Sequence, residues 1–159
     1  YVTGADGVTY YLAGHGMTAF RVTADGVEAG ETHAWQHQGV VFQFPSEVGV
    51  TRERIAWYFY SGGFGDTRIV WLDPSDNLLS NVFLPLRNSR PIAIDAESAM
   101  YFCGMRRNGR PECSALRPGE EELLWQVQLE GRAAVTGGAL VPGRLYLTTE
   151  DGTLLSIGV

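Results

Sequence analysis

Short runs in which every second residue is apolar recur along the chain, and turn signals separate them. The clearest case lies near the end, where residues 145–147 and 153–157 flank Asp151-Gly152. An Asp-Gly pair between two alternating runs is typical of a β-hairpin. No stretch shows the apolar period of an amphipathic helix. The pattern therefore predicts an all-β chain.

The runs repeat at a spacing of about 45 residues. Four kinds follow one another, which we call strands a, b, c and d: a at 1–3, 48–50, 92–94 and 139–141; b at 8–12, 55–60, 100–103 and 145–147; c at 18–22, 68–72, 113–116 and 153–157; d at 77–84 and 122–129. A four-stranded repeat of about 40–50 residues is the signature of a β-propeller blade. A β-sandwich with coincidental spacing is the alternative.

The repeats predict four four-stranded antiparallel blades, at about residues 1–39, 40–87, 88–132 and 133–159, the last without its d strand. Propellers avoid exposed strand edges by closing the ring. No spare strand precedes Tyr1, and the chain opens without Met. We therefore expect an incomplete (half) ring of a propeller of about seven or eight blades. A missing segment or a second chain would complete it.

Two stretches resemble a known repeat. Residues 143–157 are similar to the repeat of the pyrroloquinoline-quinone-like (PQQ-like) β-propeller family, and residues 115–125 resemble its tryptophan-docking motif, which begins with Ala and ends with Trp. The resemblance implies that Trp35 and Trp125 pack between neighbouring blades. The family's Asp after strand c is kept only as Asp73. The resemblance implies a fold and not a chemistry, because this repeat serves several functions.

Charge narrows the classes of partner. The net charge is −6, and all twelve basic residues are arginine. An acidic chain without a basic stripe is a poor candidate for nucleic-acid binding. No apolar run approaches the roughly 20 residues that a membrane helix needs, so we expect no membrane span.

The two cysteines flank the b–c loop of the third repeat. Asn108-Gly109 at the centre of this loop is a turn signal, which places Cys103 opposite Cys113 within disulfide range. A disulfide predicts an extracellular or periplasmic location. Two reduced cysteines in adjacent strands are the alternative.

Candidate binding residues gather in one set of loops. In a propeller the a–b and c–d loops open on one face, where this chain has an excess of acidic residues, and the b–c and d–a loops open on the other. Arginines in the stapled b–c loop suit a carboxylate, a phosphate or an acidic partner, and a solvated loop tip is the alternative. The candidates on this second face are Arg106, Arg107, Arg110, His15, Asp66, Arg87 and Arg90.

Metal and catalytic patterns are weak. His33 and His37 lie about 13 Å apart on an extended strand, too far to share one ion. Residues 73–77 begin like a calcium loop but lack its Gly and distal Glu, and an Asx-type turn explains them better. We therefore assign no catalytic residue, metal or cofactor.

The sequence favours a non-catalytic β-propeller module of a secreted or periplasmic protein that presents loops to a protein or small ligand. The alternative is part of a PQQ-dependent quinoprotein dehydrogenase, which would bring the quinone and calcium as cofactors. A hydrolase or lyase on the same scaffold is a third possibility. Each enzyme would need inward-facing groups that the sequence does not identify.

Overall fold

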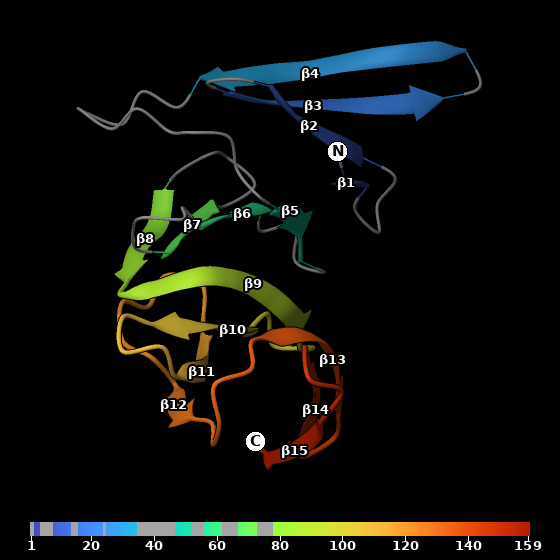
Figure 1. Cartoon of the computed structure of the whole chain (residues 1–159). Coiled ribbons are helices and arrows are strands. Elements are labelled where there is room, and N and C mark those ends of the chain that lie inside the picture. The colour runs from blue at the N-terminus through green and yellow to red at the C-terminus, as the bar shows by residue number, and fades with distance from the viewer. Residues whose placement is uncertain are drawn as a thin grey trace.

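The computed structural model describes residues 2–3, 8–13, 16–23, 25–34, 47–51, 56–61, 67–72 and 78–159. These residues form four consecutive antiparallel sheets (Figure 1). The first contains β1 (Val2–Thr3), β2 (Val8–Ala13), β3 (Gly16–Thr23) and β4 (Gly26–Ala34). The second contains β5 (Glu47–Val50), β6 (Ala56–Ser61), β7 (Thr67–Leu72) and β8 (Leu78–Leu84).

The third sheet contains β9 (Leu86–Ile94), β10 (Met100–Arg106), β11 (Pro111–Leu116) and β12 (Trp125–Gln128). The fourth has three described strands, β13 (Val135–Val141), β14 (Arg144–Thr149) and β15 (Leu154–Gly158). In every sheet the strands pair in chain order. The four sheets correspond to the four predicted repeats, and we call them blades one to four.

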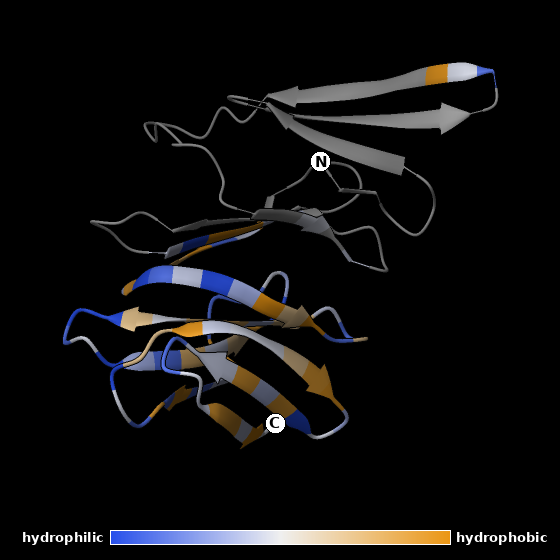
Figure 2. Cartoon of the chain, turned by 45° about the vertical axis from the view of Figure 1, so that its right-hand side comes forward, coloured by the Kyte–Doolittle hydropathy of each residue, from blue (hydrophilic) through white to orange (hydrophobic). Residues whose placement is uncertain are grey.

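Strand alternation gives blade three two apolar faces. Met100, Phe102 and Leu116 point towards blade two and join a core with Trp71 and Leu84. The intervening side chains point the other way and join a second core with blade four, made up of Ala99, Tyr101, Cys103, Cys113, Ala115, Leu129, Val135, Leu145 and Leu147. Successive side chains of a strand lie on opposite faces, so the third sheet is buried between its two neighbours. Figure 2 shows the same alternation of apolar and polar residues in blade four.

At two of the three junctions between blades, the first strands lie next to one another. β1 contacts β5, and β9 contacts β13 as well as β6 and β7. Four-stranded antiparallel sheets stacked face to face, with their first strands together, form part of a β-propeller. The predicted all-β fold is confirmed. None of the described residues belongs to a helix long and apolar enough to cross a membrane.

The boundary between blades two and three differs from the expected one. β9 begins at Leu86, whereas the sequence pattern places the first strand of this blade at residues 92–94. Only Pro85 separates β8 from β9. Proline has no N–H to donate to a ladder, so the chain changes sheets there without a loop. Residues 87–90 are all polar, so the alternation of apolar residues does not predict this part of the strand.

Candidate binding surface

A disulfide joins the two central strands of blade three. Cys103 lies directly opposite Cys113 in the β10–β11 ladder, and their sulfurs are bonded. Their Cα atoms are 4.1 Å apart, slightly closer than the usual range of about 4.4–6.8 Å. The pair occupies a non-hydrogen-bonded ladder position, where opposite Cα atoms approach to about 4.5 Å. Gly109 closes the hairpin with φ of 76°. The predicted disulfide is therefore present.

A bulge in β9 brings two of the predicted arginines onto one face. Arg87 pairs with Met105 and Arg90 with Cys103, so Asn88 and Ser89 together lie opposite the single residue Gly104. Residues three apart on a regular strand point to opposite faces. The extra residue cancels that difference, because it shifts the alternation by one. Arg87 and Arg90 therefore both lie on the side that faces blade four.

Contacts on that side agree with this register. The Arg90 Nη1 group donates to the carbonyl oxygen of Thr136 in blade four at 2.9 Å. Arg87, Arg107, Arg110 and Arg132 are all exposed. Arg110 and Arg132 line a hollow of about 420 Å³ together with Gln128 and Glu130. We call the surface formed by Arg87, Arg90, Arg107, Arg110 and Arg132 the arginine-rich end of blade three.

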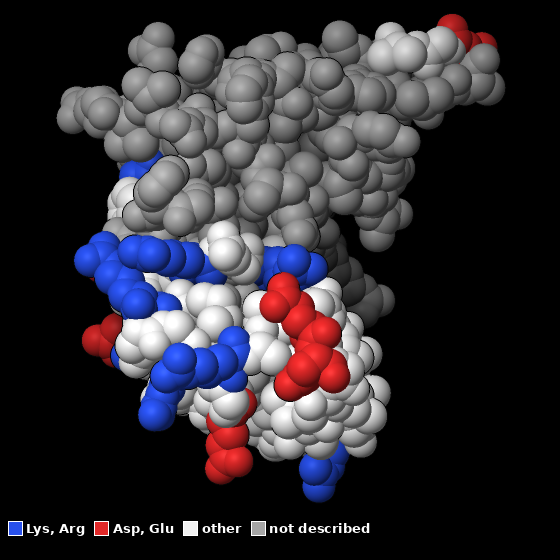
Figure 3. Space-filling model, in the orientation of Figure 1, with Lys and Arg blue, Asp and Glu red and all other residues white. Residues whose placement is uncertain are grey.

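Most of the arginines there carry unopposed charge. Within the described part of the chain, no carboxylate pairs with Arg87, Arg110 or Arg132. Figure 3 shows basic side chains gathered over the beginning of β9, apart from the larger acidic group. Several guanidinium groups close together on a rigid sheet can hold carboxylates or phosphates through paired N–H donors.

Arg106, the first of the predicted set, has a different role. Its Nε donates to Glu112, whose side chain is 2% exposed, and Gln126 Nε2 donates to the other oxygen of the same carboxylate. A buried carboxylate needs such partners to offset its lost hydration. Arg106 therefore neutralises Glu112. Unlike Arg87, Arg110 and Arg132, it does not present an unpaired charge to a ligand. Sequence reasoning missed Glu112 and Gln126, because it placed Glu112 in the b–c loop, whereas β11 begins at Pro111 and includes it.

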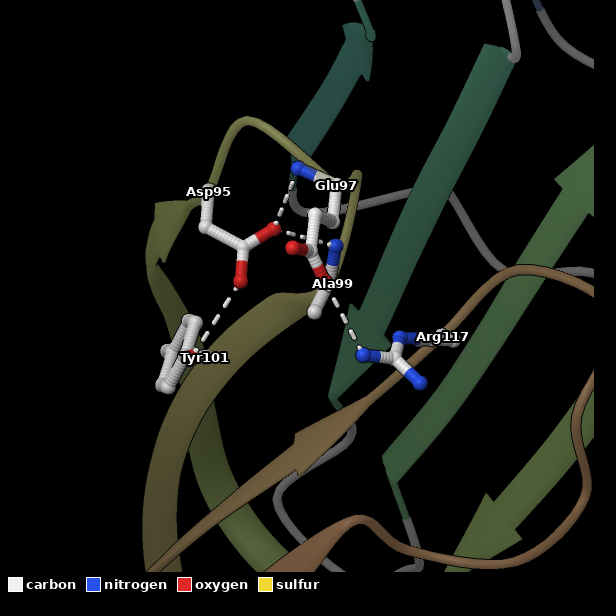
Figure 4. Close-up of polar contacts among 5 residues, drawn as sticks. All are labelled: Asp95, Glu97, Ala99, Tyr101 and Arg117. Carbon is white, nitrogen blue, oxygen red and sulfur yellow. Dashed lines mark hydrogen bonds and ion pairs between the residues drawn. The ribbon is translucent and has the colours of Figure 1, made fainter. Parts of the chain in front are cut away.

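The opposite end of blade three is organised by Asp95 (Figure 4). One of its oxygens accepts from the backbone N–H groups of Glu97 and Ala99, both at 2.9 Å, and the other accepts from the Tyr101 hydroxyl at 3.3 Å. Burial, followed by the Asp95 charge, raises the pKa of the Tyr101 hydroxyl above its ordinary value. Glu97 pairs with Arg117 at 3.0 Å. The carboxylate of Asp95 thus shapes the β9–β10 turn and ties it to Tyr101 of β10.

A groove of about 640 Å³ opens beside this turn, between β9 and β13. Its lining is mainly apolar and includes Ile92, Ile94, Leu140, Val141 and Val159. Tyr101 and Asp95 supply the polar groups at its edge. Both of these groups are already hydrogen-bonded to each other.

Trp125 lies at the junction of blades three and four. Its ring packs against the second core, and its centroid is 6.0 Å from that of Tyr101. His15, Trp35 and Asp66 lie outside the described residues, as do His37 and residues 73–77. Among the described residues, no three His, Cys, Asp or Glu side chains are grouped so that they could hold a metal ion.

Comparisons with known proteins support the fold alone. No protein-family model matches the sequence, and no curated protein matches it. Two solved structures of AztD from Citrobacter koseri, one of them the apo form, are similar over 99% of this chain, with TM-scores of 0.70 and 0.68 at 12% and 13% identity. AztD is a β-propeller protein. The chain spans 42% of the length of AztD. A nidogen/laminin complex is similar over 91% of this chain and 56% of its own, with a TM-score of 0.45 and 16% identity.

Proposed function

We propose that the chain is a non-catalytic binding module of a β-propeller, and that its arginine-rich end binds an acidic segment of a partner protein. The observation that carries the proposal is the β9 bulge. It turns Arg87 and Arg90 of β9 to the same side of the sheet, and Arg110 and Arg132 line a hollow by the end of β12. A disulfide and a paired ladder fix the strands that hold these residues. A rigid scaffold carrying functional loops is the usual arrangement of a binding site.

An acidic protein segment suits this surface better than an apolar ligand. The exposed side chains are guanidinium groups, and the hollow also contains Gln128 and the carboxylate of Glu130. Glu130 would repel an anion placed directly against it. A partner with several separated carboxylates could instead place its charges near Arg87, Arg110 and Arg132. Exposed charges of this kind steer association and are weakened by salt.

The disulfide also supports a location. Disulfides persist in oxidising compartments and are rare in the cytosol. We therefore assign the module to a secreted or periplasmic protein. We also propose that the chain is a member of the PQQ-like repeat family, because residues 115–125 and 143–157 resemble its motifs.

The test uses a fluorescent peptide of ten glutamates as an acidic probe, with binding followed by fluorescence anisotropy. We expect the double variant R110E/R132E to weaken binding about tenfold, since each reversal removes an attraction and adds a repulsion of a few tenths of a kcal/mol or more. The matched control is R144E, a charge reversal at the opposite end of the sheets. Equal loss in the control and the double variant, or no loss in either, would show that this surface does not bind acidic segments.

A further inference from the structure

We propose that β15 accepts a fourth strand, supplied by a propeller segment outside residues 1–159, and that this strand places a large aromatic side chain opposite Ser156. The proposal concerns a surface in blade four and does not rest on acidic-partner binding at blade three. The fourth blade is the only described sheet with three strands, and in the described part of the chain β15 pairs only with β14.

The strand pairing in blade three shows which residues of blade four would face the added strand. Tyr101 lies between Ala93 and Ala115 in its sheet. Tyr146 lies in the same way between Ala139 and Ser156. Ser156 therefore occupies the position of Ala115. In blade three, Trp125 of the fourth strand lies opposite Ala115 and packs beside Tyr101. A small residue at this position makes room for the ring, and blade four keeps a small residue there. The Arg144 side chain, which donates to the Ser156 hydroxyl at 3.1 Å, would have to move aside for the ring.

Side-chain exposure shows what the missing strand would cover. Tyr101 is 8% exposed, whereas its counterpart Tyr146 is 37% exposed. Leu154 takes the position of Cys113, which is fully buried, yet Leu154 is 68% exposed. Blade three loses this exposure because Trp125 and blade four cover it. The same face of blade four carries Tyr146 and Leu154 in the matching positions without that cover.

The backbone of β15 is also oriented to receive a strand. Val159 donates its N–H to Gly143, so the odd-numbered residues of β15 direct their backbone groups to β14. In an antiparallel ladder these directions alternate. Leu154, Ser156 and Gly158 therefore direct their N–H and C=O groups to the open edge. In blade three the matching Ala115 carbonyl accepts from the Leu124 N–H at 2.8 Å.

The sequence of β15 does not protect this edge. Exposed edges are usually blocked by Lys, Pro, inward-pointing charges or bulges. β15 reads Leu-Leu-Ser-Ile-Gly and has none of these residues, and its ladder with β14 is regular. An unprotected edge with an apolar face is the surface to which an extended segment adds by β-augmentation. A second copy of this chain is a poorer occupant, because the open β15 edge that it would offer reads Leu-Leu-Ser-Ile-Gly and has no aromatic residue to lie opposite Ser156.

The test offers the chain a synthetic copy of the fourth strand of blade three. A synthetic peptide with the sequence of residues 121–130, which includes Trp125, is titrated into the ¹⁵N-labelled chain and followed by NMR and amide hydrogen exchange. We expect the amides of Leu154, Ser156 and Gly158 to become protected, while those of Leu155 and Ile157 change little. A peptide with alanine in place of its tryptophan should bind about tenfold more weakly, because the packing of the tryptophan ring against Tyr146 and Ser156 is lost.

Two variants separate edge pairing from unspecific adhesion. Ser156→Pro removes an N–H that points to the open edge and leaves the β14 ladder intact, a position where proline is tolerated. We expect it to weaken peptide binding at least tenfold, whereas Ser156→Ala, the matched control, changes it less than twofold. Equal binding by both variants would overturn the proposal. If Ser156→Pro fails to fold, the exchange pattern of the unmodified chain decides instead: uniform or absent protection along β15 rejects edge pairing. A native mass of twice 17.4 kDa without peptide, lost in Ser156→Pro, would identify a second copy as the occupant and also overturn it.

Discussion

Asp151 shows how one side chain holds a turn of blade four together. Its Oδ1 atom accepts from the Thr149 hydroxyl at 2.6 Å and from the Thr153 N–H at 3.1 Å. The Thr149 hydroxyl oxygen in turn accepts from the Thr153 N–H at 3.1 Å. These hydrogen bonds, that from Thr149 first, lower the pKa of the Asp151 carboxyl below its ordinary value of 3.8.

Thr149→Val should therefore raise the pKa of Asp151 towards that ordinary value. Valine keeps the shape of the buried side chain and removes the hydroxyl donor. A lowered pKa in the folded state gives stability that is present above the unfolded value and is lost as pH falls through the folded value. The acid limb of the unfolding curve, near and below pH 3.8, should thus be steeper in the wild type than in the variant. NMR titration of the Asp151 carboxyl measures the shift, and an unchanged pKa would contradict this account.

Single residues differ in how far the sequence can predict them. The Cys103–Cys113 pair was predictable, because Asn108-Gly109 fixes the turn and the turn fixes which residues are opposite. The burial of Glu112 was not. The sequence pattern places it in the b–c loop, whereas the structure places it in β11, on the same face as Leu116, and buries it. Its partners Arg106 and Gln126 come from two other strands.

At the scale of the element, the β9 bulge decides where the arginines point. It depends on a close approach between β9 and β10, because the extra residue brings Ser89 over Gly104. A Cβ atom on Gly104 would collide with the Ser89 side chain. Ser89 is itself held by a 2.6 Å hydrogen bond from Thr67 of blade two. The bulge is thus wedged between two blades, and the sequence gives no sign of it beyond an interrupted apolar pattern at residues 87–90.

Gly104→Ala should displace this bulge. We expect the free energy of unfolding to fall by about 1–3 kcal/mol, the usual cost of overpacking a well-packed site. Binding of the ten-glutamate peptide should also weaken, since Arg87 and Arg90 would no longer share one face. Gly158→Ala is the matched control, because a Cβ at Gly158 meets nothing within 4 Å. Urea denaturation and fluorescence anisotropy measure the two effects, and equal stability of both variants would show that the bulge tolerates the methyl group.

At the scale of the whole molecule, each blade is stabilised by its neighbours. The repeat spacing in the sequence was enough to predict four sheets and their strand order, because alternation and turn residues are local signals. It could not predict which face of each sheet is better covered. That depends on contacts between blades, such as Trp125 with the second core and the Gly119 N–H with Ser80 of β8 at 3.2 Å.

Two adjacent leucines of β15 test this arrangement directly. Leu155 packs against the second core beside blade three, whereas Leu154 points away from it and is 68% exposed. Leu155→Lys places a charge against apolar side chains, and we expect it to lower the free energy of unfolding by about 2 kcal/mol or more. Leu154→Lys should change stability by less than about 0.5 kcal/mol, as is usual for exposed positions. It should nevertheless abolish binding of the strand peptide, because a lysine on an open edge opposes strand addition. Urea denaturation and peptide titration of the two variants give both readings. A large loss of stability in Leu154→Lys would mean that this face of blade four is already covered, and that no further blade is needed to bury it.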